Sequence, residues 1–296
     1  MITGFIGDIA RHRTGDGPGI RTVVFFKGCP LHCPWCHNPE FIVPQHELAF
    51  YPDRCIGCRE CADICPQRAI KQNTMIVIDR SVCDCCGECA KICPSAALAI
   101  VGRFWSVEEL LEVLLRDQLY YQVSGGGVTL SGGEPTMQMK FGGSLLRQLK
   151  KNGIHTAIET NGFFSWGEFA VHLLPWLDLV LFDLKIADKG RHAKVTGQEN
   201  EKILGNLEKL VRRGSEVVVR IPLIPGVTAD RENLAELAGE MKRIGVQKCS
   251  LLPYHFFGRS KAANIGRPAD SSLPDKRMTR AEVDGWHQYF KEFELV

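Results

Sequence analysis

Short apolar runs recur along this chain, and the stretches between several of them have apolar positions spaced as on one face of a helix. The runs, which are typical of buried strands, lie at residues 22–26, 128–130, 155–158, 179–184, 217–221 and 249–252. The helix-like stretches lie at residues 106–119, 137–151, 203–213 and 231–244. This alternation predicts six βα units on a parallel sheet, an α/β fold with too few units for a closed eight-stranded barrel. Ser106 and Glu109 have the spacing of a capping box at the start of the first of these helices.

The composition agrees with a compact globular protein. The 296 residues, 45% hydrophobic and 24% charged, suffice for one large α/β domain with a small insert. A formal net charge of +2 gives no electrostatic reason to expect nucleic acid or an anionic membrane as a partner. The N-terminus becomes polar and Gly-rich too early for a signal peptide, and the most apolar stretch, residues 171–182, contains Pro175 and Asp178. We therefore expect a cytoplasmic protein without a membrane segment.

Thirteen cysteines without a secretory signal favour thiolates that bind metal over a disulfide framework. Eight of them form an internal repeat, two copies of Cys-x2-Cys-x2-Cys-x3-Cys-Pro offset by 28 residues. This is the bacterial ferredoxin pattern for two 4Fe–4S clusters, in which the fourth cysteine of each run binds the other cluster. The predicted ligand sets are therefore Cys55, Cys58, Cys61 and Cys93 for one cluster, and Cys83, Cys86, Cys89 and Cys65 for the other.

Zinc is the alternative metal for these cysteines, but zinc sites usually take two separated pairs of ligands, and zinc does not require a repeated Cys-Pro ending. Residues 73–79 lie between the two runs and are β-like, which suits a small ferredoxin-type module. Cys85 lies outside the repeat, and we expect it to bind no metal.

A different cysteine motif follows the first predicted strand. Cys29, Cys33 and Cys36 lie on the loop at the C-terminal end of residues 22–26, where barrel enzymes place their chemistry. Three thiolates on a cubane leave one iron open to an external ligand, by the same logic that leaves a catalytic zinc with a vacant position. This loop therefore predicts a catalytic 4Fe–4S cluster.

The spacing of these three cysteines, with an aromatic residue before the third, resembles the radical S-adenosylmethionine (SAM) superfamily. The segments Asp16-Gly-Pro-Gly-Ile-Arg21, Phe26-Lys-Gly-Cys29 and Trp35-Cys-His-Asn-Pro39 resemble the activating enzymes of glycyl radical enzymes in particular. The resemblance continues, in the same order and spacing, through Ser131-Gly-Gly-Glu-Pro135, Glu159-Thr-Asn-Gly162, Asp183-Leu-Lys185, Arg220-Ile-Pro222 and Leu252-Pro-Tyr-His255.

The resemblance implies a partial, open (β/α)6 barrel. Residues 1–47 would hold the first βα unit with the cysteine loop. Residues 48–102 would be an inserted ferredoxin-like module with two 4Fe–4S clusters, and residues 103–296 would complete the barrel. The simplest members of the family lack such an insert, so this chain resembles the inserted class.

The resemblance also implies roles for single residues, each of which has a plainer reading. Gly132, Gly133 and Glu134 would approach the methionine amino group of SAM, although Gly-Gly-Glu alone is more often a turn. Glu159 and Thr160 would lie near the methionine carboxylate, where a monovalent cation would also bind, and a strand-end salt bridge is the alternative. The remaining SAM contacts would be Trp35 and the backbone of Cys36 and His37 near the adenine, together with Asp183, Leu184, Lys185 and, on the nucleoside side, His255.

Two more residues would hold the backbone of an incoming glycyl peptide. They are Asp16 and Arg220, and their plainer reading is an ordinary surface ion pair. We read Cys249, which has no cysteine near it in sequence, as a small buried hydrophobe, and we expect Lys27, Lys150 and Lys151 to be solvated.

The function implied is that of a radical SAM oxidoreductase, an activating enzyme that cleaves SAM reductively and takes a hydrogen atom from a glycine of a partner glycyl radical enzyme. The implied cofactors are three 4Fe–4S clusters, SAM and a monovalent cation. Flavodoxin or ferredoxin would supply the electron, and we expect a monomer in the absence of the partner. The alternatives are a radical SAM enzyme acting on another peptide or a small molecule, a ferredoxin fused to an unrelated barrel, and a binding scaffold. The Asp16 and Arg220 motifs disfavour the first, the three-cysteine loop disfavours the second, and the number of cluster-type cysteines disfavours the third.

Overall fold

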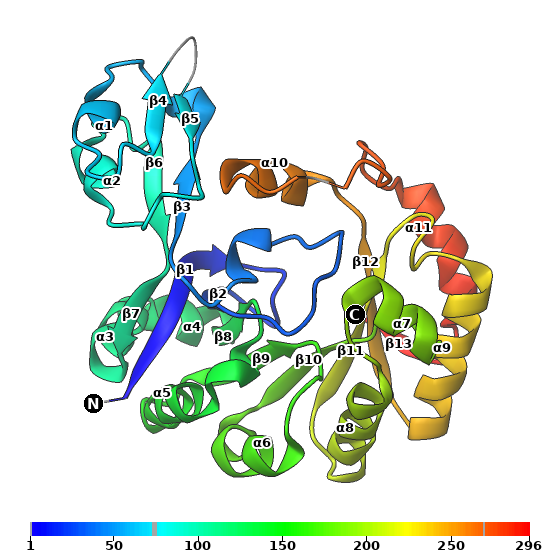
Figure 1. The fold of residues 1–296 in the computed structure, drawn as a ribbon. Coiled ribbons are helices and arrows are strands. Elements are labelled where there is room, and N and C mark those ends of the chain that lie inside the picture. The colour runs from blue at the N-terminus through cyan, green and yellow to red at the C-terminus, as the bar shows by residue number, and fades with distance from the viewer. Residues whose placement is uncertain (1, 73–75, 269) are drawn as a thin grey trace.

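The computed structural model describes residues 2–72, 76–268 and 270–296, and its main body is one curved sheet with helices on its outer face (Figure 1). The sheet has the strand order β13-β12-β11-β10-β9-β8-β2-β1-β7. All neighbours from β2 to β13 are parallel, while β1 is antiparallel to both β2 and β7. The strands are β1 (Thr3–Arg13), β2 (Arg21–Phe26), β7 (Arg103–Ser106), β8 (Gly127–Gly132), β9 (His155–Thr160), β10 (Leu179–Asp183), β11 (Val217–Leu223), β12 (Lys248–Pro253) and β13 (Glu294–Leu295).

The helices of the main body connect these strands. They are α3 (Val107–Leu115), α4 (Gln118–Ser124), α5 (Met139–Lys151), α6 (Trp166–His172), α7 (Lys189–Thr196), α8 (Glu201–Arg212), α9 (Arg231–Ile244), α10 (Phe257–Asn264) and α11 (Arg280–Trp286). Short 3-10 turns occur at η1 (Pro39–Phe41), η2 (Pro52–Arg54), η3 (Pro135–Gln138), η4 (Leu174–Trp176) and η5 (His287–Tyr289).

All six predicted strands are confirmed, because each is a member of the parallel part of the sheet. The capping box is also confirmed, since the Ser106 hydroxyl accepts from Glu109 N and the Glu109 carboxylate accepts from Ser106 N. The single helix predicted over residues 106–119 is wrong, because the chain breaks into α3 and α4. The break lies at Asp117, a buried carboxylate that accepts hydrogen bonds from Arg11 on β1 and Thr22 on β2.

The core lies between the strands and the outer helices. Apolar side chains at helical spacing, such as Leu145, Leu146 and Leu149 of α5, are fully buried in the same core cluster as Val128 and Leu130 of β8. Cys249 on β12 is completely buried in the same core, so its interpretation as a small hydrophobe is confirmed. Among the helices of the described ranges, none combines the length and the apolar character that a membrane crossing requires.

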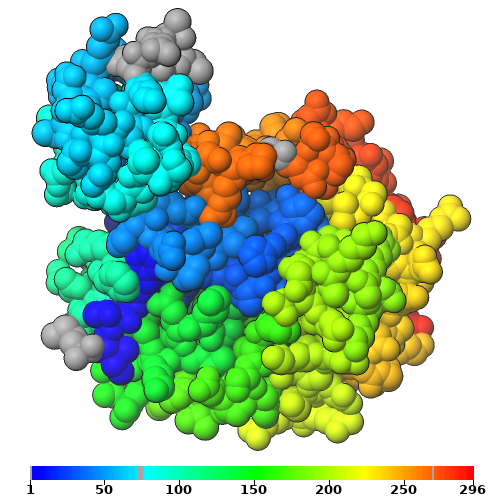
Figure 2. Space-filling model, viewed as in Figure 1, coloured from blue at the N-terminus to red at the C-terminus, as the bar shows by residue number. Residues whose placement is uncertain are grey.

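Residues 47–101 form a smaller lobe that projects from the main body (Figure 2). Its strands β3 (Glu47–Phe50) and β6 (Leu98–Val101) pair antiparallel where the lobe joins the sheet, and β4 (Ile70–Gln72) pairs with β5 (Ile76–Ile78) further out. The predicted β-like segment at residues 73–79 therefore coincides with β5, while residues 73–75 lie outside the described part of the chain. Two short helices, α1 (Glu60–Asp63) and α2 (Glu88–Ile92), carry the third cysteine of each run.

An ion-pair network joins this lobe to the main body. Lys27, just before the catalytic-type cysteine loop, is buried, and its Nζ donates to Glu47 Oε2 at 2.8 Å and to the carbonyl oxygen of Glu40 at 2.9 Å. Arg267 contacts the other Glu47 oxygen at 2.6 Å. The expectation that Lys27 is solvated is therefore wrong, because the start of the lobe folds over it and supplies a carboxylate.

The position of Glu47 leads to a prediction about stability. Glu47→Ala should lower the free energy of unfolding by roughly 3–5 kcal/mol, because it leaves the Lys27 ammonium buried without its partner. The measurement is the thermal midpoint of the protein, purified under anaerobic conditions, at one scan rate. The matched control is Glu112→Ala, which breaks an exposed pair with Arg116 and should change the midpoint very little. Equal effects of the two substitutions would contradict the buried network.

Candidate active site

The loop that carries Cys29, Cys33 and Cys36 begins at the C-terminal end of β2, on the inner side of the curved sheet (Figure 1). Its first residues are held by backbone hydrogen bonds, from Gly28 N to the carbonyl of Phe41 at 2.8 Å and from Cys29 N to that of Ile42 at 2.9 Å. The protein backbone alone therefore fixes the start of the loop at the end of the strand.

Gly132 and Gly133 pack against this loop. A Cβ on Gly132 would lie 2.3 Å from Phe26 N, and one on Gly133 would lie 2.3 Å from Gly28 O, so only glycine fits at either position. Gly132 also has a φ of +115°, which side chains rarely tolerate. The amides of Gly133 and Glu134 donate to Phe26 O and Gly28 O. The motif thus clamps the cysteine loop, a packing role that the sequence interpretation did not include, and its contact with a ligand remains a prediction.

The Glu134 side chain is buried and fully engaged within the protein. Its Oε1 accepts from the Thr160 and Thr136 hydroxyls at 2.9 and 2.7 Å, and its Oε2 accepts from Asn161 N at 2.7 Å. Burial raises the pKa of Glu134, and these hydrogen bonds offset part of the increase. Asn161, which the sequence interpretation missed, in turn directs its Nδ2 to Cys29 Sγ at 3.6 Å. A chain of hydrogen bonds thus runs from Glu134 to a cysteine of the loop.

The three thiols share an environment that suits metal binding. Burial raises the pKa of Cys29, Cys33 and Cys36, to about 12 for Cys36. A metal that binds them must displace their protons, and burial leaves few competing water ligands. The loop therefore fits a cluster held by three thiolates.

Four charged side chains from three neighbouring strand ends form a network next to the loop. Arg220 on β11 donates from Nε to Asp183 Oδ1 at 2.9 Å and from Nη1 to Glu159 on β9, while Lys185 Nζ reaches Asp183 Oδ2 at 2.9 Å. The register places Asp183 directly opposite Arg220 across β10 and β11. The reading of Arg220 as an ordinary surface pair is therefore wrong, because its side chain is only 14% exposed.

The charges in this network hold each other ionised. Burial alone would raise the pKa of Asp183, but Arg220 and Lys185 outweigh it and the pKa is lowered. Burial would likewise lower the pKa of Lys185, yet Asp183 and the nearby Cys33 raise it. Glu159 is different, because burial raises its pKa and Arg220 offsets only part of that increase. Its second partner is the hydroxyl of Ser131, another residue the sequence interpretation did not single out as a contact.

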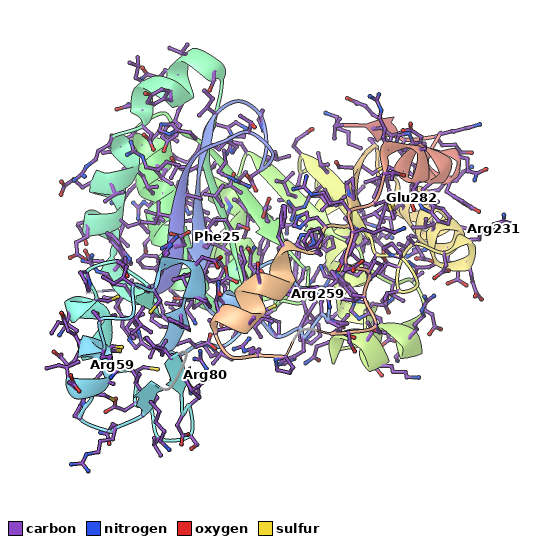
Figure 3. The ribbon with its side chains drawn as sticks, turned by 90° about the horizontal axis from the view of Figure 1, so that it is seen from above. Phe25, Arg59, Arg80, Arg231, Arg259 and Glu282 are labelled. Atoms are coloured by element: carbon purple, nitrogen blue, oxygen red, sulfur yellow. The ribbon has the colours of Figure 1, made fainter. Side chains whose placement is uncertain are left out.

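A cavity of about 360 Å³ opens on the other side of the cysteine loop, between the loop and α10. It is lined by Trp35 and Cys36 of the loop and by Tyr254 and His255, which follow β12. Arg259 on α10, labelled in Figure 3, also lines it. Trp35 is buried with Tyr254 in a small apolar cluster.

Two imidazoles beside this cavity have the chemistry to bind a polar ligand. The rings of His37 and His255 stack at 3.9 Å between centroids, and burial lowers the pKa of His37 to about 4. Within the described residues, buried His37 Nε2 and His255 Nδ1 have no hydrogen-bond partner. Buried polar atoms are nearly always paired, so this pair fits a polar ligand such as a nucleoside.

Asp16 lies on a loop against the inner side of β8. Its carbonyl oxygen accepts from the Thr129 hydroxyl at 2.7 Å, and its carboxylate is 3.3 Å from Arg13 Nε. Its charge contributes to the raised pKa of Glu159, so it lies within electrostatic range of the network. The structure brings Asp16 toward Arg220 without direct contact between the two side chains.

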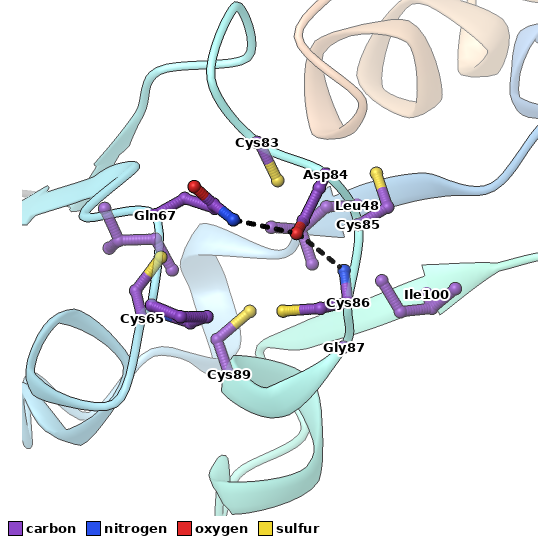
Figure 4. Close-up of a pocket in the computed structure, with 12 residues that line it drawn as sticks. Leu48, Cys65, Gln67, Cys83, Asp84, Cys85, Cys86, Gly87, Cys89 and Ile100 are labelled. Carbon is purple, nitrogen blue, oxygen red and sulfur yellow. Dashed lines mark hydrogen bonds between the residues drawn. The ribbon is translucent and has the colours of Figure 1, made fainter.

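The cysteines of the projecting lobe gather into the two sets that the repeat predicts. Cys55, Cys58, Cys61 and Cys93 line one pocket, and Cys65, Cys83, Cys86 and Cys89 line another, shown in Figure 4. Cys85 also lines the second pocket, although Figure 4 shows its sulfur pointing away from the other four. Across the described ranges, no three His, Cys, Asp or Glu side chains converge closely enough for a single bound ion, and each set surrounds a space instead.

Comparison with known proteins finds a matching family model and several similar proteins. Residues 23–238 match the family model of the Radical SAM superfamily. The chain is 42% identical to the benzylsuccinate synthase activating enzyme of Thauera aromatica, over 94% of this chain and 86% of that protein. It is 41% identical to the isethionate sulfite-lyase activating enzyme of Nitratidesulfovibrio vulgaris, over 95% and 94%. It is 39% identical to the choline trimethylamine-lyase activating enzyme of Oleidesulfovibrio alaskensis, over 94% and 93%.

A solved structure supports the fold alone. The radical SAM methyltransferase from Sphaerobacter thermophilus aligns with 98% of this chain and 76% of its own, with a TM-score of 0.54 and 13% identity. At that identity the likeness extends to the arrangement of strands and helices, and no further.

Proposed function

We infer the reaction of this chain from its family, because it belongs to the radical SAM superfamily and, within it, to the activating enzymes of glycyl radical enzymes. It cleaves SAM and transfers a hydrogen atom from a glycine of a partner enzyme to the 5′ carbon, leaving a glycyl radical on the partner. When bound, a 4Fe–4S cluster and SAM would supply the electron, the 5′-deoxyadenosyl radical and the leaving methionine. The observation that carries this proposal is the partly buried three-thiol loop, which lies next to an ion network and to two imidazoles that each have one buried nitrogen without a hydrogen-bond partner among the described residues.

The protein's own residues hold and orient these groups. Cys29, Cys33 and Cys36 are the proposed cluster ligands, and Asn161 positions the first of them through its contact with Sγ. Asp183 and the nearby Cys33 raise the pKa of Lys185, so its ammonium group stays protonated. Its positive charge can therefore stabilise negative charge at the site. The proposed SAM contacts are Trp35, Cys36, His37, Gly132, Gly133, Glu134, Glu159, Thr160, Asp183, Leu184, Lys185 and His255, and the proposed contacts of the glycyl peptide are Asp16 and Arg220.

The projecting lobe is the proposed ferredoxin-like insert, residues 48–102, between residues 1–47 and 103–296 of the partial barrel. Its two cysteine sets would each hold a 4Fe–4S cluster, because the sets line separate pockets and follow the crossed ligand pattern. We also propose that the enzyme works in the cytoplasm, is a monomer without its partner, and takes its electron from reduced flavodoxin or ferredoxin.

The proposed function predicts two products in one anaerobic experiment. The reconstituted, reduced protein with SAM should form 5′-deoxyadenosine, and a glycyl radical signal should appear on its partner in equal amount. The signal is measured by electron paramagnetic resonance with each glycyl radical enzyme from the same genome in turn. Formation of 5′-deoxyadenosine with no radical on any of them would favour a small-molecule or other peptide substrate.

The insert clusters are proposed to relay electrons, and this leads to a separate prediction. Cys58→Ala and Cys86→Ala, one in each set, should cleave SAM normally with dithionite but fail to do so with reduced flavodoxin. A chemical reductant reaches the catalytic cluster directly, whereas a protein donor needs the relay. Cys85→Ala, outside the repeat, serves as the control. If only binding of the partner enzyme is lost, the insert is a docking or structural element instead.

A further inference from the structure

Helix α4 turns its apolar side chains toward solvent. Leu119 is 69% exposed, Tyr120 47% and Val123 81%, and Tyr121 is the only α4 residue of the described chain that is buried. Positions 119 and 123, and 120 and 123, lie four and three residues apart, so the three exposed side chains share one face. Helices on globular proteins normally bury such a face, and an exposed apolar patch of this kind marks an interaction site.

This α4 face, defined by Leu119, Tyr120 and Val123, adjoins the loop that carries Asp16. Ile20 N donates to the Ser124 hydroxyl at 2.8 Å, and the backbone of Gly19 packs so closely on Ser124 and Gly126 that a Cβ would lie 2.5 Å from Gly126 N. On the other side, the half-exposed ring of His12 meets the Tyr120 ring edge-on at 4.7 Å. Figure 1 shows α4 next to β1, the strand that leads into the Asp16 loop.

We propose that the α4 face is a docking surface for the folded partner glycyl radical enzyme, beside the point where the partner's glycine loop enters. The proposal rests on the proposed function and adds to it a contact outside the peptide site. A loop that reaches Asp16 brings the partner surface around it onto the neighbouring α4 face. Leu119, Tyr120 and Val123 would then be covered only in the complex.

The position of the face favours this partner over a second copy of the chain. A second copy seated on α4 would cover the adjoining Asp16 loop and block the peptide that the enzyme must bind. The partner enzyme avoids this conflict. Its glycine loop would itself bind at the Asp16 loop, so the partner surface around the glycine loop can cover the α4 face at the same time. The patch is small, so it would strengthen a transient complex rather than hold a permanent one.

The test compares a double variant, Leu119→Ser with Val123→Ser, with the wild type and a matched control. The control is Val171→Ser, since Val171 on α6 is 68% exposed and lies away from the Asp16 loop. Three quantities are measured for each cluster-loaded protein. They are 5′-deoxyadenosine formed without any partner, glycyl radical formed on increasing amounts of the full-length partner, and hydrogen abstraction from a synthetic peptide that copies the partner's glycine loop. The partner is the glycyl radical enzyme from the same genome on which the wild type produces the radical.

The double variant should need about tenfold more partner for half-maximal radical formation, the change that a loss of about 1.4 kcal/mol in binding produces. Its partner-free 5′-deoxyadenosine and its reaction with the short peptide should match the wild type, as should all three readouts of Val171→Ser. An unchanged dependence on the full partner would overturn the proposal, as would equal losses in the double variant and Val171→Ser. A wild-type dimer that the double variant abolishes, with no change toward the partner, would assign the face to a second copy. Absence of 5′-deoxyadenosine from the wild type would overturn the proposed function, and the docking surface with it.

Discussion

Cys33→Ala should abolish formation of 5′-deoxyadenosine while leaving most of the iron in place. The loss is expected to be complete, because two thiolates cannot hold a cubane in the position that three hold. With the three proposed 4Fe–4S clusters, the iron content should fall from roughly twelve to roughly eight atoms per chain, since the substitution leaves both cysteine sets of the projecting lobe unchanged. The measurements are 5′-deoxyadenosine by chromatography and iron by colorimetric assay on the same anaerobic preparation.

A buried cysteine elsewhere provides the matched control for this prediction. Cys249 is completely buried on β12 in the main apolar core, so Cys249→Ala should keep the full iron content and SAM cleavage. If Cys33→Ala lost all of its iron, the three sites would not be independent. If it kept wild-type cleavage, the three-thiol loop would not be the catalytic centre.

The parallel strands β2, β8, β9, β10 and β11 could be predicted because nearly all of their residues are buried. Such strands appear as continuous apolar runs, as at residues 179–183. The strands that were missed lack this signal. The outer half of β1 is exposed and carries Asp8, Arg11 and Arg13, and β13 has only two residues. Their place in the sheet depends on pairing with β2 and β12, which the local sequence does not encode.

The site residues that belong to a sequence motif could be predicted. Those whose role depends on contacts with distant parts of the chain could not. The spacing of the cysteines indicates both sets of the insert, because three of the four proposed ligands of each cluster lie close together in sequence and the run repeats. The burial of Lys27 gave no such signal, since its partner Glu47 lies 20 residues further along the chain and Arg267, which binds the other Glu47 oxygen, lies 240 residues from Lys27. The same holds for Asn161, whose contact with Cys29 joins β9 to β2. A search for polar residues after each predicted strand finds Lys27 after residues 22–26 and Asn161 shortly after residues 155–158, but it finds neither Glu47 nor the burial of Lys27.

The second prediction with a large expected effect concerns the substitution of Arg220. Arg220→Met should lower the free energy of unfolding by roughly 3–5 kcal/mol, because the Asp183 and Glu159 carboxylates stay buried without their shared cation. The thermal midpoint of the cluster-loaded protein should then fall by about 6–15 °C, given the usual response of a domain of this size. Glycyl radical formation should also fall, since Arg220 is a proposed contact of the glycyl peptide.

The pH dependence of this loss distinguishes an electrostatic cause from a packing defect. Without Arg220, burial should raise the pKa of both carboxylates above their unfolded values, as it already does for Glu159. A group whose pKa is higher in the folded state contributes stability below its unfolded pKa and loses it as the pH rises through its folded pKa. The difference in midpoint between Arg220→Met and the wild type should therefore be smaller at pH 6 than at pH 8.

The ion pair between Arg191 and Asp230 provides the matched control for the Arg220 measurement. Arg191 contacts Asp230 at 2.6 Å, but both side chains are about one third exposed, so water can replace the lost partner. Arg191→Met should accordingly lower the midpoint only slightly and by the same amount at both pH values. Equal, pH-independent losses in the two variants would mean that the Arg220 network contributes packing alone. A larger loss at pH 8 in Arg220→Met only would mean that its charge keeps Asp183 and Glu159 ionised beside the reacting groups.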